Sequence, residues 1–189
     1  MDQELWLYTV DDDYVNYLNG FDNRIVSNKE NSRVFERKYL GTVLKVNDID
    51  YFVPLASPKN SDYQTDKAGN RQIRRSIVPI MRIVYKEING VSTLIGTLKF
   101  SNMIPVLDSV VTKYDVKNET DLAYQNLVYK EWEFIRSRKA DIFKNARTIY
   151  SQKTKSVQGI GYLDNTVDFL LLEEKAKLYV KNNKCEIDE

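Results

Sequence analysis

A hydroxyl, an ammonium group and two prolines occur together in the segment Pro54-Leu55-Ala56-Ser57-Pro58-Lys59. The residues before it form two β-rich runs joined by the polar pair Asn47-Asp48, a pattern that predicts a β-hairpin over residues 39–56. Because proline fixes φ, Pro54 and Pro58 are expected to bracket the exit of this hairpin and to stiffen it. The pattern therefore predicts that Ser57 and Lys59 are presented from a rigid turn, as functional side chains often are.

The residue types that are missing limit the chemistry. The chain has no histidine and a single cysteine, Cys185, so Ser-His-Asp and Cys-His triads and a histidine-rich metal site are excluded. Catalysis would have to use Ser, Thr, Tyr, Lys, Arg or carboxylates. No nucleotide-binding loop, zinc cluster or paired metal-carboxylate motif is found, and we expect no metal or other cofactor. Residues 11–13 are consecutive aspartates, whose pattern favours capping of a helix over binding of a cation.

Positive charge is concentrated in two parts of the chain, although the formal net charge is only +1. Residues 1–22 carry six acids and no base, whereas residues 59–86 carry seven bases against two acids, and residues 130–155 carry eight against three. A face with such an excess typically binds phosphate polyanions. The alternative is that these are ordinary solvated surface charges.

The length of 189 residues fits one domain, residues 1–189, that can bury a core without disulfides. A lone cysteine cannot form an internal disulfide, the first residues are acidic, and no apolar run approaches the roughly 20 residues that span a bilayer. We expect a soluble, cytoplasmic protein that does not enter a membrane.

Hydrophobic periodicity predicts the elements that must position these side chains. The expected strands are residues 4–10, the hairpin 39–56, a second hairpin from 78–87 and 91–100 around Asn89-Gly90, and an edge strand at 101–106 that contains Pro105. The expected helices cover residues 11–20, 119–138, 142–150 and 169–180, with polar loops at 21–36 and 57–76. The fold class is therefore α+β, a twisted and mainly antiparallel sheet with packed helices, one of them long.

Cations combined with 13 tyrosines suit the recognition of single-stranded RNA, in which cations bind phosphates and aromatic rings stack on bases. Cleavage of RNA needs no metal if the ribose 2′-OH attacks the adjacent phosphorus while Lys, Arg and Ser stabilise the charged phosphorane. Two alternatives remain at this point. One is a non-catalytic RNA-binding module, and the other is a scaffold whose basic faces meet acidic protein partners.

Five motifs together resemble the ToxN/AbiQ family, the endoribonuclease toxins of type III toxin-antitoxin and phage abortive-infection systems. The resemblance covers residues 5–180, and its most specific part is the Pro-Leu-x-Ser-Pro-Lys element at 54–59. The other motifs are Tyr14-Val15-x-Tyr17-Leu18, Arg37-x-Tyr39-x-Gly41, Leu98-Lys99-Phe100-x-x-Met103-Ile104-Pro105 and Phe169-Leu170-Leu171-Leu172-Glu173-Glu174-Lys175.

This resemblance implies a sheet core similar to that of the MazF/Kid toxins. It also implies metal-independent, sequence-selective cleavage of cellular and phage RNA, leaving a 2′,3′-cyclic phosphate and a 5′-hydroxyl. The implied partner is an RNA antitoxin of tandem repeats, each a pseudoknot, which the toxin processes and which inhibits it in an oligomeric protein–RNA assembly.

Carried over residue by residue, the resemblance implies that Ser57 is the key hydroxyl, Lys59 the nearby cation, Arg37 a contact to the scissile phosphate, and Tyr14 part of the active centre. Without the family, these residues would be a surface turn, a strand-edge charge and a core tyrosine. The expected RNA-binding cations are Lys38, Arg71, Arg74, Arg75, Lys99, Lys139 and Arg147. The segment 27–36 has no tyrosine where the family pattern has one, and Phe35 is its aromatic substitute.

Overall fold

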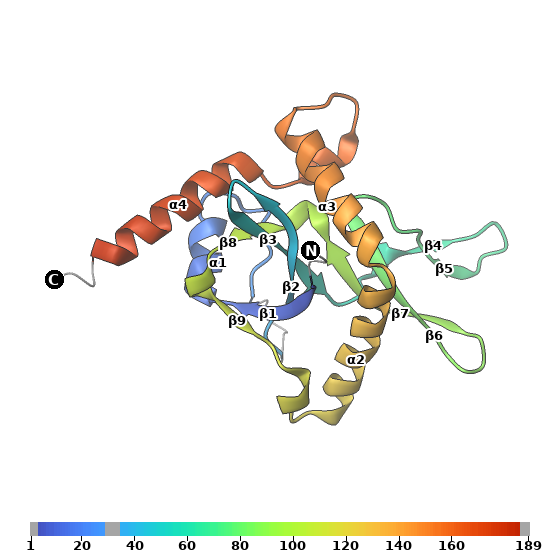
Figure 1. Cartoon of the computed structure of the whole chain (residues 1–189). Coiled ribbons are helices and arrows are strands. Elements are labelled where there is room, and N and C mark those ends of the chain that lie inside the picture. Colours follow the sequence, from blue (N-terminus) through green and yellow to red (C-terminus); the bar gives the residue numbers. More distant parts are fainter. Residues whose placement is uncertain (1–3, 29–34, 186–189) are drawn as a thin grey trace.

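The computed structural model describes residues 4–28 and 35–185, with side chains up to residue 180. A sheet of seven strands lies at its centre, in the order β6-β7-β3-β2-β1-β9, and β8 pairs with β3 beside this path (Figure 1). All of its pairings are antiparallel, which confirms the predicted sheet type. The strands are β1 (Trp6–Val10), β2 (Tyr39–Val46), β3 (Ile49–Ala56), β6 (Ile80–Lys86), β7 (Ser92–Lys99), β8 (Ile104–Val106) and β9 (Val111–Lys113).

Four helices pack around this sheet in the described part of the chain, so that the predicted α+β class is confirmed. They are α1 (Asp12–Asn19), α2 (Leu122–Ser137), α3 (Lys139–Thr154) and α4 (Phe169–Cys185). Helix α2 contacts β6 and β7, α3 contacts β2, and α4 contacts β8 and α1. The predicted long helix is α2 with 16 residues, but α3 and α4 match it with 16 and 17. Of the helices described, none has the length and apolar character needed to cross a bilayer.

Aspartates at the start of α1 act as the sequence predicts. The Asp11 carboxylate accepts a hydrogen bond from the backbone N–H of Asp13 at 2.9 Å, which satisfies one of the free donors of the first helical turn. Asp12 and Asp13 place negative charge at the positive end of the helix dipole. The expectation of a cap is therefore confirmed.

The β2–β3 hairpin has the predicted turn. Asn47 and Asp48 both adopt positive φ, 48° and 63°, as a tight two-residue hairpin requires. The pairing of its two strands is irregular near Gly41, where the register shifts between Leu40 and Leu44. A Cβ atom at Gly41 would overlap the ring of Phe52, so only glycine allows this aromatic ring to pack against β2.

Pro54 lies inside β3, two residues before the strand ends at Ala56, and is buried. The N–H of Leu55 donates to the carbonyl of Lys38, toward β2, so the nitrogen of Pro54 faces the other edge of β3. On that edge, pairing with β8 ends at Phe52 and pairing with β7 begins at Leu55. The proline therefore occupies a gap between two partner strands, where no ladder donor is needed.

Two polar or short segments contain strands that periodicity did not reveal. The predicted loop 57–76 holds a small hairpin, β4 (Tyr63–Thr65) and β5 (Arg71–Ile73), which projects from the body of the molecule in Figure 1. Strand β9 extends the sheet beside β1. Strands β4, β5 and β9 are each three residues long, too short for an alternating pattern to be recognised. Strand β8 pairs only along one stretch of β3, as expected of an edge strand with Pro105.

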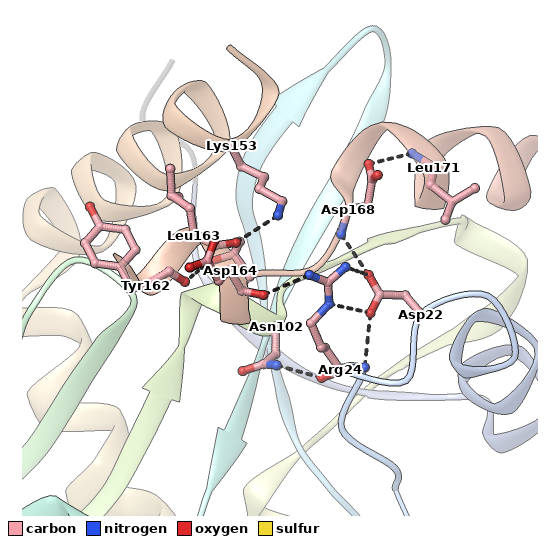
Figure 2. Close-up of polar contacts among 10 residues, drawn as sticks. Asp22, Arg24, Asn102, Lys153, Tyr162, Leu163, Asp164, Asp168 and Leu171 are labelled. Carbon is pink, nitrogen blue, oxygen red and sulfur yellow. Dashed lines mark hydrogen bonds and ion pairs between the residues drawn. The ribbon is translucent and has the colours of Figure 1, made fainter. Parts of the chain in front are cut away.

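A polar network, here called the α4 anchor and defined by Asp22, Arg24, Asn102 and Asp168, fixes the start of α4 (Figure 2). The Arg24 guanidinium donates from Nε and Nη2 to the two carboxylate oxygens of Asp22, both at 2.8 Å. The backbone N–H of Asp168 donates to Asp22 as well, and the Asn102 amide donates to the Arg24 carbonyl. The network thereby joins segments that are far apart in sequence at the N-terminal end of α4.

Candidate active site

A cleft of about 420 Å³ opens where β3 ends, between the sheet and helix α2. It is the natural place for a functional site because the ends of three strands and one helix converge there. Its lining residues are Val26, Phe35, Arg37, Lys38, Leu55, Ala56, Ser57, Pro58, Lys59, Ile95, Lys99, Tyr124, Leu127 and Glu131. Five of the residues predicted from sequence meet in this cleft, namely Arg37, Lys38, Ser57, Lys59 and Lys99.

The corner that carries Ser57 and Lys59 is exposed but firmly held. Both side chains are exposed, whereas Ala56 before them is buried and its carbonyl accepts a hydrogen bond from the buried Thr97 hydroxyl. The backbone N–H of Lys59 donates to the Asp62 carboxylate at 2.9 Å. Within the described part of the chain, the Ser57 hydroxyl makes no hydrogen bond, so it remains available to a ligand.

A buried ion pair between Asp62 and Arg82 stabilises the corner that carries Ser57 and Lys59. Asp62 and Arg82 approach to 3.1 Å, and their side chains are only 6% and 7% exposed. Arg82 also donates to the carbonyl of Arg75, at the end of the segment that β4 and β5 occupy. A buried pair of this kind resists removal of either partner, because the remaining charge would be left uncompensated. The Ser57–Lys59 corner is therefore attached to β6 rather than to a free loop.

Arg37 lies at the base of the cleft and is 1% exposed. Its guanidinium donates from Nε to the Ser27 carbonyl at 3.1 Å and from Nη1 to the Leu55 carbonyl at 2.8 Å. These bonds hold a permanent positive charge next to the last residues of β3. The neighbouring Lys38 is also buried, and its ammonium lies 4.2 Å from the ring centre of Tyr114.

Aromatic rings form one wall of the cleft. Phe35 and Tyr124 stack with their ring centres 3.9 Å apart and their planes 5° from parallel. Both line the cleft together with the cations, so a flat aromatic surface stands beside a positively charged one. Bases of single-stranded RNA stack on such surfaces. The substitute role of Phe35 for a tyrosine is thus compatible with its place in the structure.

Glu131 brings a carboxylate to this basic site. It lies on α2, is 8% exposed and faces Gly96, where a Cβ atom would overlap its Oε1 atom. Glycine at position 96 thereby leaves room for the carboxylate. The lining holds four cations, Arg37, Lys38, Lys59 and Lys99, against this one acid. Such a set suits a phosphate rather than a divalent cation, which prefers several oxygen ligands.

Tyr14, which the resemblance assigns to the active centre, is not among the residues that line this cleft. Its side chain is fully buried, and its hydroxyl donates to the carbonyl of Pro105 at 2.8 Å. The ring packs edge-on against Tyr179 of α4. Burial is the main reason that the pKa of Tyr14 is raised far above its ordinary value. Tyr14 therefore joins α1 to β8 and α4 in the core.

The remaining predicted RNA-binding cations fall into two groups outside the cleft. Arg71, Arg74 and Arg75 are exposed on and beside the β4–β5 hairpin. The Arg71 guanidinium stacks 3.8 Å from the Tyr63 ring centre and also donates to the side chain of Asn60, so this group adjoins the Ser57–Lys59 corner. Lys139 and Arg147 lie on α3, where Arg147 is exposed.

Sequence reasoning missed the part of the cleft that α2 supplies. The sequence predicted a helix over residues 119–138 but no functional residue in it, whereas Tyr124, Leu127 and Glu131 of α2 line the cleft. Residues 124, 127 and 131 follow helical spacing, and this spacing is the same whether the helix face packs on the core or lines a cleft. The sequence therefore does not distinguish the two cases. Asp62 and Arg82, 20 positions apart in the sequence, likewise carry no local mark of their pairing.

Together, the antiparallel sheet, the exposed hydroxyl and the cationic cleft are typical of a protein that acts on a phosphate polymer. Comparison with known families is more specific: residues 6–177 match the family described as "Toxin ToxN, type III toxin-antitoxin system". The chain therefore belongs to the ToxN toxin family. The resemblance found in the sequence is confirmed.

Individual relatives agree with this membership. "Endoribonuclease AbiQ" of Lactococcus lactis subsp. lactis is 32% identical over 181 residues, covering 95% of this chain and 91% of that protein. A solved structure of AbiQ, described as a lactococcal anti-phage endoribonuclease belonging to the type III toxin-antitoxin system, superimposes with a TM-score of 0.73 at 31% identity, covering 95% of this chain and 99% of that one. The structure of a type III toxin, whose study reports selective inhibition by a non-coding RNA pseudoknot, gives a TM-score of 0.72 at 25% identity, covering 94% and 98%.

Proposed function

We propose that this protein is a single-domain endoribonuclease toxin that cleaves single-stranded RNA in the Ser57 cleft without a metal. The observation that carries the proposal is the meeting of an exposed hydroxyl with four cations and an aromatic wall in one cleft. Family membership and the endoribonuclease relatives support the same activity. The related anti-phage endoribonuclease AbiQ supports a role in antiphage abortive infection, and a substrate of cellular and phage RNA places the proposed activity in the cytoplasm.

The proposed reaction is an intramolecular transesterification. The 2′-oxygen of a ribose forms a bond to the adjacent phosphorus as the bond from phosphorus to the 5′-oxygen breaks. The 2′-hydroxyl loses its proton and the departing 5′-oxygen gains one, so the products are a 2′,3′-cyclic phosphate and a 5′-hydroxyl. Negative charge develops on the non-bridging oxygens, where a hydrogen bond from Ser57 and the charge of Lys59 would stabilise it.

Other parts of the cleft would position the substrate. Arg37 supplies a fixed positive charge at the base, since its hydrogen bonds to the Ser27 and Leu55 carbonyls prevent it from moving away. The Phe35–Tyr124 stack would hold a base next to the scissile linkage. Holding the sugar and phosphate in line for attack is itself a large part of such catalysis.

The proposed partner is an RNA antitoxin made of repeated pseudoknots, which the toxin processes and which then occupies the cleft. The related toxin that is selectively inhibited by an RNA pseudoknot supports this proposal. The exposed arginines of the β4–β5 hairpin adjoin the cleft and offer a phosphate-binding surface for a folded RNA. We propose that toxin and antitoxin form an oligomeric assembly.

The test is cleavage of single-stranded RNA by the purified protein in the presence of a chelator, with both ends of the products mapped. We expect 5′-hydroxyl and 2′,3′-cyclic phosphate ends from the wild type. We expect Ser57→Ala to lose at least about 100-fold in rate, the usual cost of removing one oxyanion donor. Because Ser57 is exposed, the variant should keep the thermal stability of the wild type.

Three results would separate this function from its alternatives. Cleavage by Ser57→Ala at the wild-type rate would show that the site is assigned incorrectly. Salt-sensitive RNA binding by the wild type, with no new 5′-hydroxyl ends, would identify a binding module instead. Loss of cleavage in the chelator, restored by added Mg²⁺, would contradict the metal-independent chemistry.

A further inference from the structure

The two tryptophans of the chain lie beside a second pocket, of about 380 Å³, which shares no lining residue with the Ser57 cleft. Their ring centres are 6.4 Å apart and their planes differ by 20°. We call this the tryptophan pocket, defined by its lining residues Glu4, Leu5, Trp6, Trp132, Arg136 and Lys139. It joins the start of β1 to the second half of α2 and the start of α3.

Trp6 points away from the core, although tryptophan is a largely apolar residue. Its neighbours Leu5 and Leu7 are buried, 7% and 5% exposed, and alternation along the strand turns Trp6 to the opposite face, where it is 39% exposed. Tryptophan has the largest apolar surface of any side chain, so leaving over a third of it in water forgoes considerable stabilisation. An exposed aromatic surface inside a pocket is typical of a binding site.

Positive charge surrounds these two rings. The ammonium of Lys113 lies 3.1 Å from the centre of the Trp6 ring. Arg136 is exposed at the pocket, and Lys139 of α3 also lines it. Aromatic faces for bases, combined with cations for phosphates, form the chemistry by which proteins hold single-stranded RNA. Glu4 adds an acceptor for the amino groups of a base.

Helix α2 connects this pocket to the cleft. Glu131 lines the cleft and the next residue, Trp132, lines the tryptophan pocket, about 100° further around the helix. From Tyr124 to Trp132 the helix rises about 12 Å. One continuous single strand can therefore contact the Phe35–Tyr124 stack and then reach the tryptophan pocket along the same helix.

We propose that the tryptophan pocket is a second nucleotide-binding subsite, which stacks an unpaired base of the RNA away from the bond that is cut. This inference rests on the proposed function, because it takes RNA as the ligand. The pocket would increase affinity for a strand long enough to reach it. It would thereby favour long single strands over short fragments.

The chain offers a direct measurement, because its intrinsic tryptophan fluorescence comes only from Trp6 and Trp132. A single-stranded RNA of mixed sequence, free of internal pairing, is titrated into the Ser57→Ala variant, which holds the RNA without cutting it. We expect saturable quenching of the emission. The same sequence annealed as a duplex should quench far less, since its bases are already stacked.

Two variants test whether the pocket contributes affinity. Trp132→Leu in the Ser57→Ala background should raise the dissociation constant for this RNA about 10-fold, as expected when one base loses its aromatic partner. Arg136→Ala, at an exposed position that leaves the fold undisturbed, should raise it a few-fold and reduce its salt dependence. Lys177→Ala, which removes an exposed cation of α4, is the matched control and should leave affinity unchanged.

The inference and the proposed function can fail separately. If the wild type cleaves RNA while the emission stays constant and both pocket variants bind normally, the subsite is overturned and the proposed function stands. Equal quenching by single strand and duplex would also overturn it, because base stacking would not be involved. If the wild type neither binds nor cleaves RNA, the proposed function itself fails.

Discussion

The Ser57 cleft and the α4 anchor are both built from charged side chains, but their charges are balanced in different ways. In the anchor, the Arg24 guanidinium meets the Asp22 carboxylate directly and the backbone completes the network (Figure 2). In the cleft, four cations among the lining residues face a single carboxylate. The anchor pairs one cation directly with one carboxylate, whereas the cleft lining has a net positive charge, although Lys38 also lies 3.9 Å from the carboxylate of Glu36. A net positive charge of this kind suits an external phosphate.

The largest expected effect comes from the cleft. Lys59→Ala should reduce the rate of RNA cleavage about 100- to 1,000-fold, because an ammonium group beside the developing negative charge is lost. The thermal unfolding midpoint should stay unchanged, since the side chain is exposed. The measurement is single-turnover cleavage of a labelled RNA, with Lys86→Ala, an exposed cation at the end of β6, as control. A loss of similar size in the control would mean that charge in general, rather than this position, matters.

A substitution in the α4 anchor should reduce stability and leave cleavage unchanged. The Asp22 side chain is only 2% exposed, and Asp22→Ala removes the carboxylate that pairs with Arg24. Because the Arg24 side chain is 34% exposed and can be solvated, we expect the free energy of unfolding to fall by about 2 kcal/mol, the cost of leaving the buried donors of Asp22 without their acceptor. Denaturant unfolding measures this, and cleavage per folded molecule should remain near the wild-type value. A variant of full stability would show that the network is not needed to hold α4.

The same carboxylate predicts a dependence on pH. Burial tends to raise the pKa of Asp22, but hydrogen bonds from the Arg24 side chain and from two backbone N–H groups outweigh it, and the pKa is lowered. A group with a lowered pKa in the folded state stabilises the fold above its unfolded pKa of about 3.9 and loses this contribution as pH falls further. Unfolding free energies measured at decreasing pH should therefore drop more steeply below about pH 4 in the wild type than in Asp22→Asn. Parallel curves would contradict this assignment.

Tyr14→Phe tests whether Tyr14 contributes to the stability of the core or to cleavage. The change leaves the Pro105 carbonyl without its donor and should cost about 1–2 kcal/mol of unfolding free energy. Cleavage at a temperature where the variant is folded should equal that of the wild type, because the cleft does not include Tyr14. A fall in rate as large as that of Ser57→Ala would return Tyr14 to the catalytic chemistry.

Sequence patterns predicted those parts of the fold that depend on neighbours along the chain. The Asn47-Asp48 turn, the Asp11 cap and the period of α2 are local, and all three are present as expected. Helical spacing could not decide whether Tyr14 packs in the core or faces a site, because both arrangements give the same pattern. Only tertiary contacts decide between them.

The residues that line the cleft were also predicted only in part. Its hydroxyl and cations were predicted from one segment and a family resemblance, and the structure places five of the predicted residues together. The part of the lining that Tyr124 and Glu131 of α2 supply was not predicted, because more than 60 residues separate it from Ser57 in sequence. The reason that Pro54 is tolerated inside β3 is likewise absent from the local sequence, because it depends on where two distant strands end.

The smallest expected effect concerns the arginines that border the cleft. Arg71 stacks on Tyr63 and donates a hydrogen bond to Asn60, and no carboxylate within residues 4–28 and 35–180 forms an ion pair with it. If it contacts one RNA phosphate, Arg71→Ala should weaken RNA binding only a few-fold and lower the slope of log affinity against log salt by about 1, for all sequences alike. Binding measured at several salt concentrations tests this. An unchanged slope would assign Arg71 to the hairpin rather than to RNA, and the excess of positive charge that matters would then be confined to the cleft itself.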